Sequence, residues 1–255
     1  MYLPSFSLTD QTFLITGAGR GIGRALAIGM AEAGANIILV ARTERDLKET
    51  AQEIERLGRT AYIFPCDITD RKQVVETVAR AYEQVPQIDG LVNNAGMNIR
   101  SKALDVTEDE WETIQQTNLK SAFFFAQEIG KRMQETGGSI LNIASVAGHV
   151  ALRTGVVYAT TKAAMIQMTK VLALEWGPQN IRVNAIGPWY FKTPLTEPLL
   201  EDPTYLQEIV DVTPLGRVGE LEELVGPTVF LSSAAARYVT GQTLYVDGGM
   251  TIKGF

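Results

Sequence analysis

The side chains of Tyr158 and Lys162 could move a proton together. They lie four residues apart in a run with helical spacing, YATTKAAMIQMTKVLALEW, so they face the same side of one helix. A phenol with a pKa of about 10 is a poor base at neutral pH, but an adjacent ammonium stabilises the phenolate and lowers that pKa. Acid–base chemistry then becomes feasible. Because this spacing also occurs by chance in many helices, the pair needs support from other residues.

Two predicted strand ends supply that support. Ser145 ends the apolar run SILNIA at 139–144, and the small polar segment NNAG at 93–96 follows another run, IDGLV. Ligands of parallel sheets bind at the carboxyl ends of the strands. The Ser145 hydroxyl could donate to a carbonyl oxygen and stabilise the alkoxide that forms on hydride attack. Asn118 lies on the helix expected after the second of these strand ends.

A glycine-rich turn follows the first predicted strand, TFLIT, and leads into a helix. Its glycines are Gly17, Gly19, Gly21 and Gly23. Glycine lets the backbone approach a pyrophosphate, and the free amides of a helix N-terminus attract its charge. The spacing departs from the general dinucleotide motif, because Ile22 stands sixth from Gly17, and no Gly-Lys-Ser/Thr of a Walker A loop follows. A simple strand-to-helix connection is the alternative.

The turn after the second predicted strand favours NADP over NAD. A carboxylate there reads the ribose of NAD, whereas an arginine accommodates the 2′-phosphate of NADP. Arg42 occupies this turn with a fork suited to phosphate, and Arg20 in the glycine-rich turn could add a second charge. The alternative is that both arginines are solvated and that Thr43 or Glu44 contacts the ribose.

Strand-like and helical patterns alternate along the chain, which predicts an α/β fold of the doubly wound Rossmann type. A parallel seven-stranded sheet with helices on both faces is expected. The predicted strands are TFLIT at 12–16, NIILV at 36–40, TAYIF at 60–64, IDGLV at 88–92, SILNIA at 139–144, IRVNAI at 181–186 and TLYV at 243–246.

No repeat or linker interrupts the pattern, so residues 1–255 are predicted to form one domain. The exception is the segment from about 193 to 219, where four prolines interrupt a helical pattern. This segment, here called the lid, is predicted to consist of broken helices and loops over an active site. The alternative is an irregular surface insertion.

Composition narrows the function classes. The formal charge of −6 disfavours a broad surface for nucleic acid or anionic lipid. Cys66 and His149 are the only residues of their types, so neither a disulfide nor a zinc site of the usual Cys and His ligands can form. The start, MYLPSFSLTDQ, lacks the pattern of a signal peptide, and no run approaches the ~20 apolar residues of a membrane span. A cytoplasmic protein is expected.

The motifs together resemble the short-chain dehydrogenase/reductase family, in its branch with a single compact domain. They occur in family order as TGAGRGIG at 16–23, CDIT at 66–69, NNAG at 93–96, Asn118, Ser145, YATTK at 158–162 and VDGG at 246–249. The resemblance covers nearly the whole chain. It implies an oxidoreductase that transfers a hydride between NADP(H) and a carbonyl or secondary alcohol.

The resemblance also implies roles for individual residues. Tyr158 would act as acid or base, Ser145 would orient the carbonyl, and Lys162 would lower the pKa of Tyr158 and hold the nicotinamide ribose. Asn118 would support a water relay to Lys162. Further cofactor contacts are implied for Asp67 and Ile68 at the adenine, Asn94 at the adenosine ribose, and Phe191 and Thr193 at the nicotinamide amide. Relatives commonly form tetramers, through helices near 107–135 and 154–177 and through the C-terminal strand.

Two features bear on the substrate. The family usually has Pro-Gly after the sixth strand, whereas this chain has Pro188-Trp189, and the indole could either narrow the substrate site or turn outward under the lid. Arg100 follows NNAG by four residues and would suit a carboxylate. Together with IGPWYFKT, which resembles gluconate 5-dehydrogenases, it favours a sugar acid or oxo-acid. The alternatives are a general ketone or 3-oxoacyl reductase, and a non-catalytic NADP sensor.

Overall fold

Short apolar runs that contain β-branched residues and are bounded by turns form seven parallel strands in one sheet. The computed structural model describes residues 2–253. Its strands are β1 (Thr12–Thr16), β2 (Asn36–Ala41), β3 (Ala61–Pro65), β4 (Gly90–Asn93), β5 (Gly138–Ile143), β6 (Ile181–Pro188) and β7 (Thr243–Val246). Their order across the sheet is β3-β2-β1-β4-β5-β6-β7. The predicted doubly wound Rossmann-type fold is therefore confirmed.

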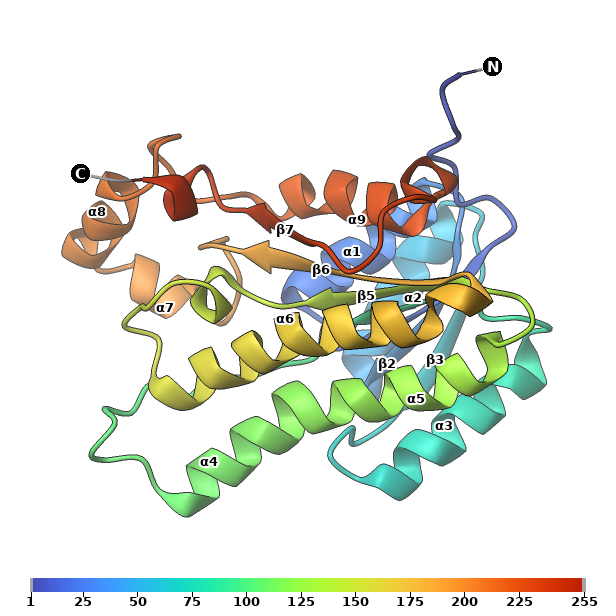
Figure 1. Ribbon diagram of the computed structural model, residues 1–255, viewed down its shortest axis with the longest axis horizontal. Helices are drawn as coiled ribbons and strands as arrows, with labels where there is room; N and C mark the ends of the chain where they lie inside the picture. The colour runs from blue at the N-terminus through green and yellow to red at the C-terminus, as the bar shows by residue number, and fades with distance from the viewer. Residues whose placement is uncertain (1, 254–255) are drawn as a thin grey trace.

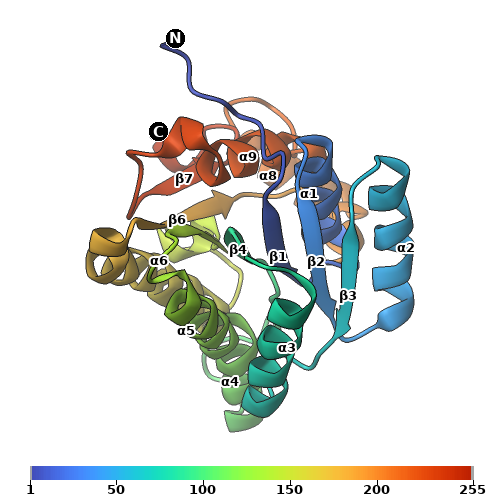
Figure 2. The same ribbon diagram turned by 90° about the vertical axis from the view of Figure 1, so that its right-hand side faces the viewer.

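Helices connect the strands and cover both faces of the sheet, as Figures 1 and 2 show. They are α1 (Gly21–Glu32), α2 (Glu44–Arg56), α3 (Arg71–Gln84), α4 (Glu108–Gln115), α5 (Ser121–Met133), α6 (Val156–Trp176), α7 (Glu197–Leu200), α8 (Pro203–Asp211) and α9 (Val225–Ser232). A π-helical turn spans Gln116–Lys120, and 3₁₀ turns span Val146–Gly148, Gly177–Gln179, Leu221–Leu224, Ala234–Ala236 and Met250–Ile252.

Alternation along β1 divides the core into two layers. Phe13 and Ile15 face the layer of α1, α2 and α9, whereas Leu14 faces the layer of α3, α5 and α6. All three side chains are almost fully buried. Burial on both faces explains why the strands read as continuous apolar runs.

The strand order reverses between β1 and β4. The chain moves outward from β1 through β2 to β3, and then returns to place β4 on the other side of β1. In open parallel sheets, ligands bind where the strand order reverses in this way. The glycine-rich turn after β1 and the NNAG segment after β4 flank this point.

The prolines break the segment 193–219 into two short helices and turns, as their positions predict. Pro203 begins α8, and the Asp202 carboxylate caps it by accepting from the amides of Thr204 and Tyr205. In Figure 1, α7 and α8 lie at the end of the molecule toward which the arrow of β6 points. Among residues 2–253, no helix is long and apolar enough to cross a membrane.

Candidate active site

The fold brings Ser145, Tyr158 and Lys162 together at the carboxyl end of β5. Ser145 follows this strand, and its hydroxyl oxygen accepts from the amide of Ala147 at 3.1 Å. The Ser145 side chain lies near enough to Tyr158 to lower the pKa of its phenol. Lys162 lies one turn further along α6, with its Nζ atom 5.6 Å from the centre of the Tyr158 ring. Two hydroxyl groups and an ammonium thus occupy one small site.

Burial controls the protonation of Tyr158. It raises the pKa of the phenol above its ordinary value, while the polar side chain of Ser145 and the positive charge of Arg100 act in the opposite direction. The sequence predicts that Lys162 lowers this pKa. Burial outweighs the influences that lower the pKa of Tyr158, and the role of Lys162 stays a prediction.

Lys162 is buried, and its ammonium group bonds to the backbone. Its Nζ donates to the carbonyl oxygen of Ile143 at 2.7 Å, and its side chain is buried. Burial penalises the ammonium and lowers the pKa of Lys162 to about 8. The residue therefore carries a positive charge at neutral pH that can be withdrawn by a modest rise in pH.

Asn118 lies in the π-helical turn between α4 and α5. Its Oδ1 accepts from the amide of Met97 at 2.8 Å, and its Nδ2 donates to the carbonyl of Met97 at 2.9 Å. A Cβ atom added to Gly96 would lie 3.3 Å from Asn118 Oδ1 and 3.7 Å from Lys162 Nζ. Asn118 thus fixes the loop after β4 and lies close to the ammonium. Such π-helical turns occur frequently at functional sites.

Asn94 ties the ends of β4 and β1 together. Its Nδ2 donates to the carbonyl oxygens of Thr16 at 3.0 Å and Gly17 at 3.3 Å. A Cβ atom on Gly23 would lie 2.2 Å from the oxygen of Gly17, so only glycine allows α1 to pack against the turn this closely. The glycines and Asn94 together set the shape of the turn.

The residues around this turn fit a dinucleotide. The N-terminus of α1 has no side-chain cap and no acidic residue in its first turn, which leaves its amides available for a pyrophosphate. Gly21 has a φ of +54°, and a Cβ atom there would meet nothing nearer than Pro194 at 3.6 Å. Ile22 is partly buried beside it.

Arg20 and Arg42 both remain available for a phosphate. Each side chain is exposed, and neither forms a salt bridge within the described residues 2–253. Glu44, the alternative ribose contact, pairs with Lys48 at 2.7 Å. The contrast supports the reading of Arg42 as a phosphate ligand.

The remaining predicted cofactor residues line the same edge of the sheet. After β3, Asp67 accepts from the amide and hydroxyl of Thr69 through Oδ1, and Ile68 packs against the apolar layer of α3 and α5. Phe191 and Thr193 are buried at the start of the lid. The side chain of Thr193 lies 3.9 Å from the position of a Cβ atom on Gly21. The lid therefore begins directly over the glycine-rich turn.

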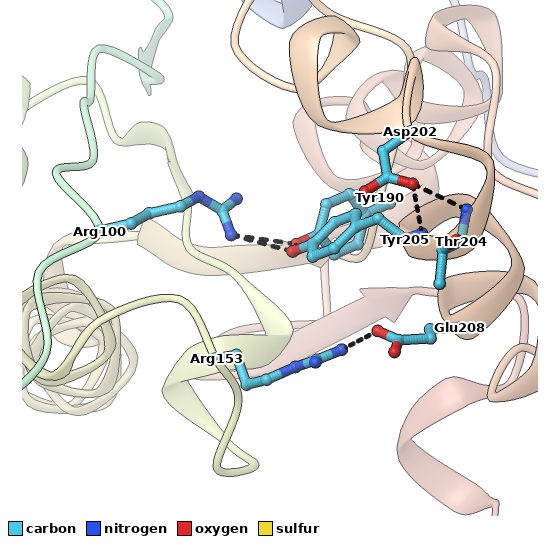
Figure 3. Close-up of polar contacts among 7 residues, drawn as sticks. All are labelled: Arg100, Arg153, Tyr190, Asp202, Thr204, Tyr205 and Glu208. Atoms are coloured by element: carbon cyan, nitrogen blue, oxygen red, sulfur yellow. Dashed lines mark hydrogen bonds and ion pairs between the residues drawn. The ribbon is translucent and has the colours of Figure 1, made fainter.

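Arg100 reaches from the loop after β4 to the lid, as Figure 3 shows. Its Nη1 donates to the hydroxyl oxygens of Tyr190 at 3.3 Å and Tyr205 at 3.1 Å. Because its charge lowers the pKa of Tyr158, Arg100 also lies within electrostatic reach of that phenol. A second contact to α8, the ion pair of Arg153 with Glu208, lies beside it.

Comparison with known proteins agrees with this arrangement. A family model described as enoyl-(acyl carrier protein) reductase matches residues 17–251. A chloroplastic tropinone reductase homolog of Arabidopsis thaliana is 41% identical over 98% of this chain and 78% of its own length. Gluconate 5-dehydrogenase of Gluconobacter oxydans is 39% identical over 97% of each chain. The chain belongs to the short-chain dehydrogenase/reductase family.

A solved structure of this family extends the comparison to three dimensions. A gluconate 5-dehydrogenase from Burkholderia cenocepacia, determined in complex with NADP and tartrate, superposes with a TM-score of 0.95 at 37% identity over 100% of both chains. The expectation of an oxidoreductase acting on alcohol or carbonyl groups is thus confirmed.

Trp189 distinguishes this family member from the usual Pro-Gly pattern. Its Nε1 donates to the hydroxyl oxygen of Thr213 at 3.0 Å, and its ring packs edge-on against Tyr190 at 4.7 Å. The indole joins an apolar cluster with Ile209 of α8. Of the two alternatives, the structure shows the one in which Trp189 packs under the lid.

Sequence reasoning missed Tyr190 and Tyr205 in this short-chain dehydrogenase/reductase. The two phenol oxygens lie 2.6 Å apart, although the residues come from the end of β6 and from α8. An aromatic run, Trp189-Tyr190-Phe191, was the one signal in the sequence. It could not indicate which of the three side chains would face Arg100.

Proposed function

We propose that this protein transfers a hydride between NADP(H) and a carbonyl or secondary alcohol of a sugar acid or oxo-acid. Arg100 is the main support for this substrate class, because it lies near Tyr158 and its hydrogen-bond partners in the protein are tyrosine hydroxyls rather than carboxylates. A carboxylate matches its guanidinium in charge and geometry. Gluconate 5-dehydrogenases among the relatives, one determined with tartrate, point the same way.

The cofactor would lie along the edge of the sheet where the strand order reverses. The pyrophosphate would bind at Gly17, Gly21, Ile22 and Gly23, and the 2′-phosphate of NADP at Arg20 and Arg42. Asp67 and Ile68 would bind the adenine, Asn94 the adenosine ribose, Lys162 the nicotinamide ribose, and Phe191 and Thr193 the nicotinamide amide. When bound, the nicotinamide supplies or accepts the hydride.

In the reducing direction, the carbonyl oxygen would lie between the hydroxyls of Ser145 and Tyr158. Ser145 would donate a hydrogen bond to that oxygen, and Tyr158 would transfer its phenolic proton as negative charge develops. The nearby Lys162 ammonium would stabilise the phenolate, and Asn118 would support the path that returns a proton through water. A raised pKa keeps Tyr158 protonated at neutral pH, which favours the role of acid.

A neutral ketone or 3-oxoacyl substrate is the second candidate. The tropinone reductase homologs and the family model described as an enoyl-(acyl carrier protein) reductase favour it. A sensor without turnover is disfavoured, since Ser145, Tyr158 and Lys162 are all present.

The lid at 193–219 is proposed to close over the substrate within one domain.

A substrate panel separates these candidates. Ketones, oxo-acids and sugar acids would be supplied with NADPH or NADP, and then with the NADH pair, while nicotinamide absorbance is followed. We expect turnover of acids with NADPH or NADP, and in Arg100→Ala a KM for acids about 10- to 100-fold higher. Lys102→Ala, which removes a charge from the same loop, is the control. An unchanged KM for acids in Arg100→Ala would overturn the acid proposal.

We also propose a cytoplasmic homotetramer. Exposed apolar side chains support contacts through the regions 107–135 and 154–177, since Trp111 on α4 and Val171 and Leu174 on α6 are exposed. Leu244 in the C-terminal strand is exposed as well. Light scattering of the purified protein gives the mass directly, and a monomer would overturn the assembly.

A further inference from the structure

Arg100 is fixed by two phenols that come from separate parts of the chain. Tyr190 follows β6, Tyr205 lies on α8 of the lid, and Arg100 lies on the loop after β4. One guanidinium nitrogen, Nη1, donates to both hydroxyl oxygens. These three residues, called the clasp, converge in Figure 3. Because a guanidinium is planar, holding Nη1 at two points restricts the direction of its other donors.

The other donors of Arg100 have no acceptor among the protein atoms of residues 2–253. Within residues 2–253, neither Nε nor Nη2 of Arg100 has a hydrogen-bond partner, and no carboxylate forms a salt bridge with this side chain. Its neighbour Arg153 differs, since it pairs with Glu208. Two arginines therefore meet the same lid helix, and Arg100 keeps an unpaired edge.

The phenols leave the charge of Arg100 intact. Burial and the hydrogen bond with Tyr205 together raise the pKa of Tyr190 to about 12, against the opposing influence of Arg100. Tyr190 is thus a neutral phenol at physiological pH. The clasp supplies orientation without neutralising the cation, which an aspartate or glutamate in its place would do.

We propose that Tyr190 and Tyr205 are positioning residues that aim the Nε–Nη2 edge of Arg100 at the carboxylate of the substrate. This inference rests on the acid substrate proposed above. Two parallel hydrogen bonds from that edge would hold the carboxylate and would place the reacting carbon at a set distance from Tyr158. Because Tyr205 belongs to α8, a lid displaced from Arg100 would also lose the aim of the guanidinium. Binding of the carboxylate and closure of the lid are therefore coupled.

Removal of one hydroxyl tests the clasp while keeping the aromatic packing. Tyr205→Phe and Tyr190→Phe would each be assayed with D-gluconate and with its neutral amide, using NADP. We expect the KM for D-gluconate to rise about 3- to 10-fold in each variant, the size of one hydrogen bond, with the KM for the amide unchanged. In the Arg100→Ala background, Tyr205→Phe should have no further effect on KM, because the group it orients is gone.

Glu208→Gln is the matched control. It weakens the neighbouring contact of α8 with Arg153 and leaves the clasp in place. If loosening of the lid were the cause, Glu208→Gln and Tyr205→Phe would each raise the KM for D-gluconate and for its amide alike, and that result would overturn the clasp. The clasp alone also fails if Arg100→Ala raises the KM for D-gluconate but neither phenylalanine variant does. An unchanged KM for D-gluconate in Arg100→Ala would overturn both the proposal of an acid substrate and the proposal of the clasp.

Discussion

The two sides of the candidate site are built by different kinds of contact. On the cofactor side, Lys162, Asn118 and Asn94 bond to backbone atoms of Ile143, Met97, Thr16 and Gly17. On the substrate side, contacts join side chains to one another across the lid, as in the clasp and in Arg153 with Glu208.

The two kinds of contact differ in how well they tolerate substitution of a residue. A contact to the backbone constrains only one side chain, so many sequences can share the same cofactor side. A contact between two side chains requires both partners, and replacing either one alters the lid. We therefore expect the substrate to vary among relatives while the proton chemistry stays fixed, in keeping with the range of substrates in their names.

Tyr158→Phe should have the largest effect and should not discriminate between substrates. Loss of the phenolic proton removes general acid catalysis, so kcat should fall about 10²- to 10⁴-fold for acids and neutral substrates alike. Steady-state kinetics with both classes measures this, and NADPH binding followed by its fluorescence shows that the cofactor site is intact. Activity within a factor of about 10 of the wild type would exclude the proposed role.

Arg42→Ala should have an intermediate effect and should discriminate between cofactors. If Arg42 binds the 2′-phosphate, kcat/KM for NADPH should fall about 10- to 100-fold, the value of a charged hydrogen bond, whereas that for NADH should not change. Arg45→Ala is the matched control, since Arg45 lies nearby on α2 and already pairs with Glu49. Equal losses with both cofactors would instead indicate a disturbed β2 or α2.

The contrast between the two sides also explains what could be predicted from the sequence. Strand periodicity is local, and the seven predicted strands match β1 to β7 within one or two residues at each end. Ser145 and the pair of Tyr158 and Lys162 could be brought together because strand ends and helical spacing determine their positions. Their roles remain predictions.

The clasp could not be predicted in this way. Its hydrogen bonds connect residues 90 and 105 positions apart in the sequence, through a lid whose path depends on tertiary packing. Burial of the Tyr158 phenol, which raises its pKa, is likewise invisible in the spacing of Tyr158 and Lys162. Trp189 could not be placed either, since its partner Thr213 lies at the far end of the lid.

The smallest expected effect is a pH dependence of stability, and Lys162→Met serves to isolate it. Burial lowers the pKa of Lys162 from 10.5 to about 8. Between these values the unfolded state binds more protons than the folded state, so this group makes the protein more stable as the pH rises. From pH 7 to pH 9.5, the free energy of unfolding of the wild type should increase by about 2 kcal/mol relative to that of Lys162→Met. Urea unfolding at several pH values measures the difference, and parallel curves would show that the Lys162 ammonium is not destabilised by burial.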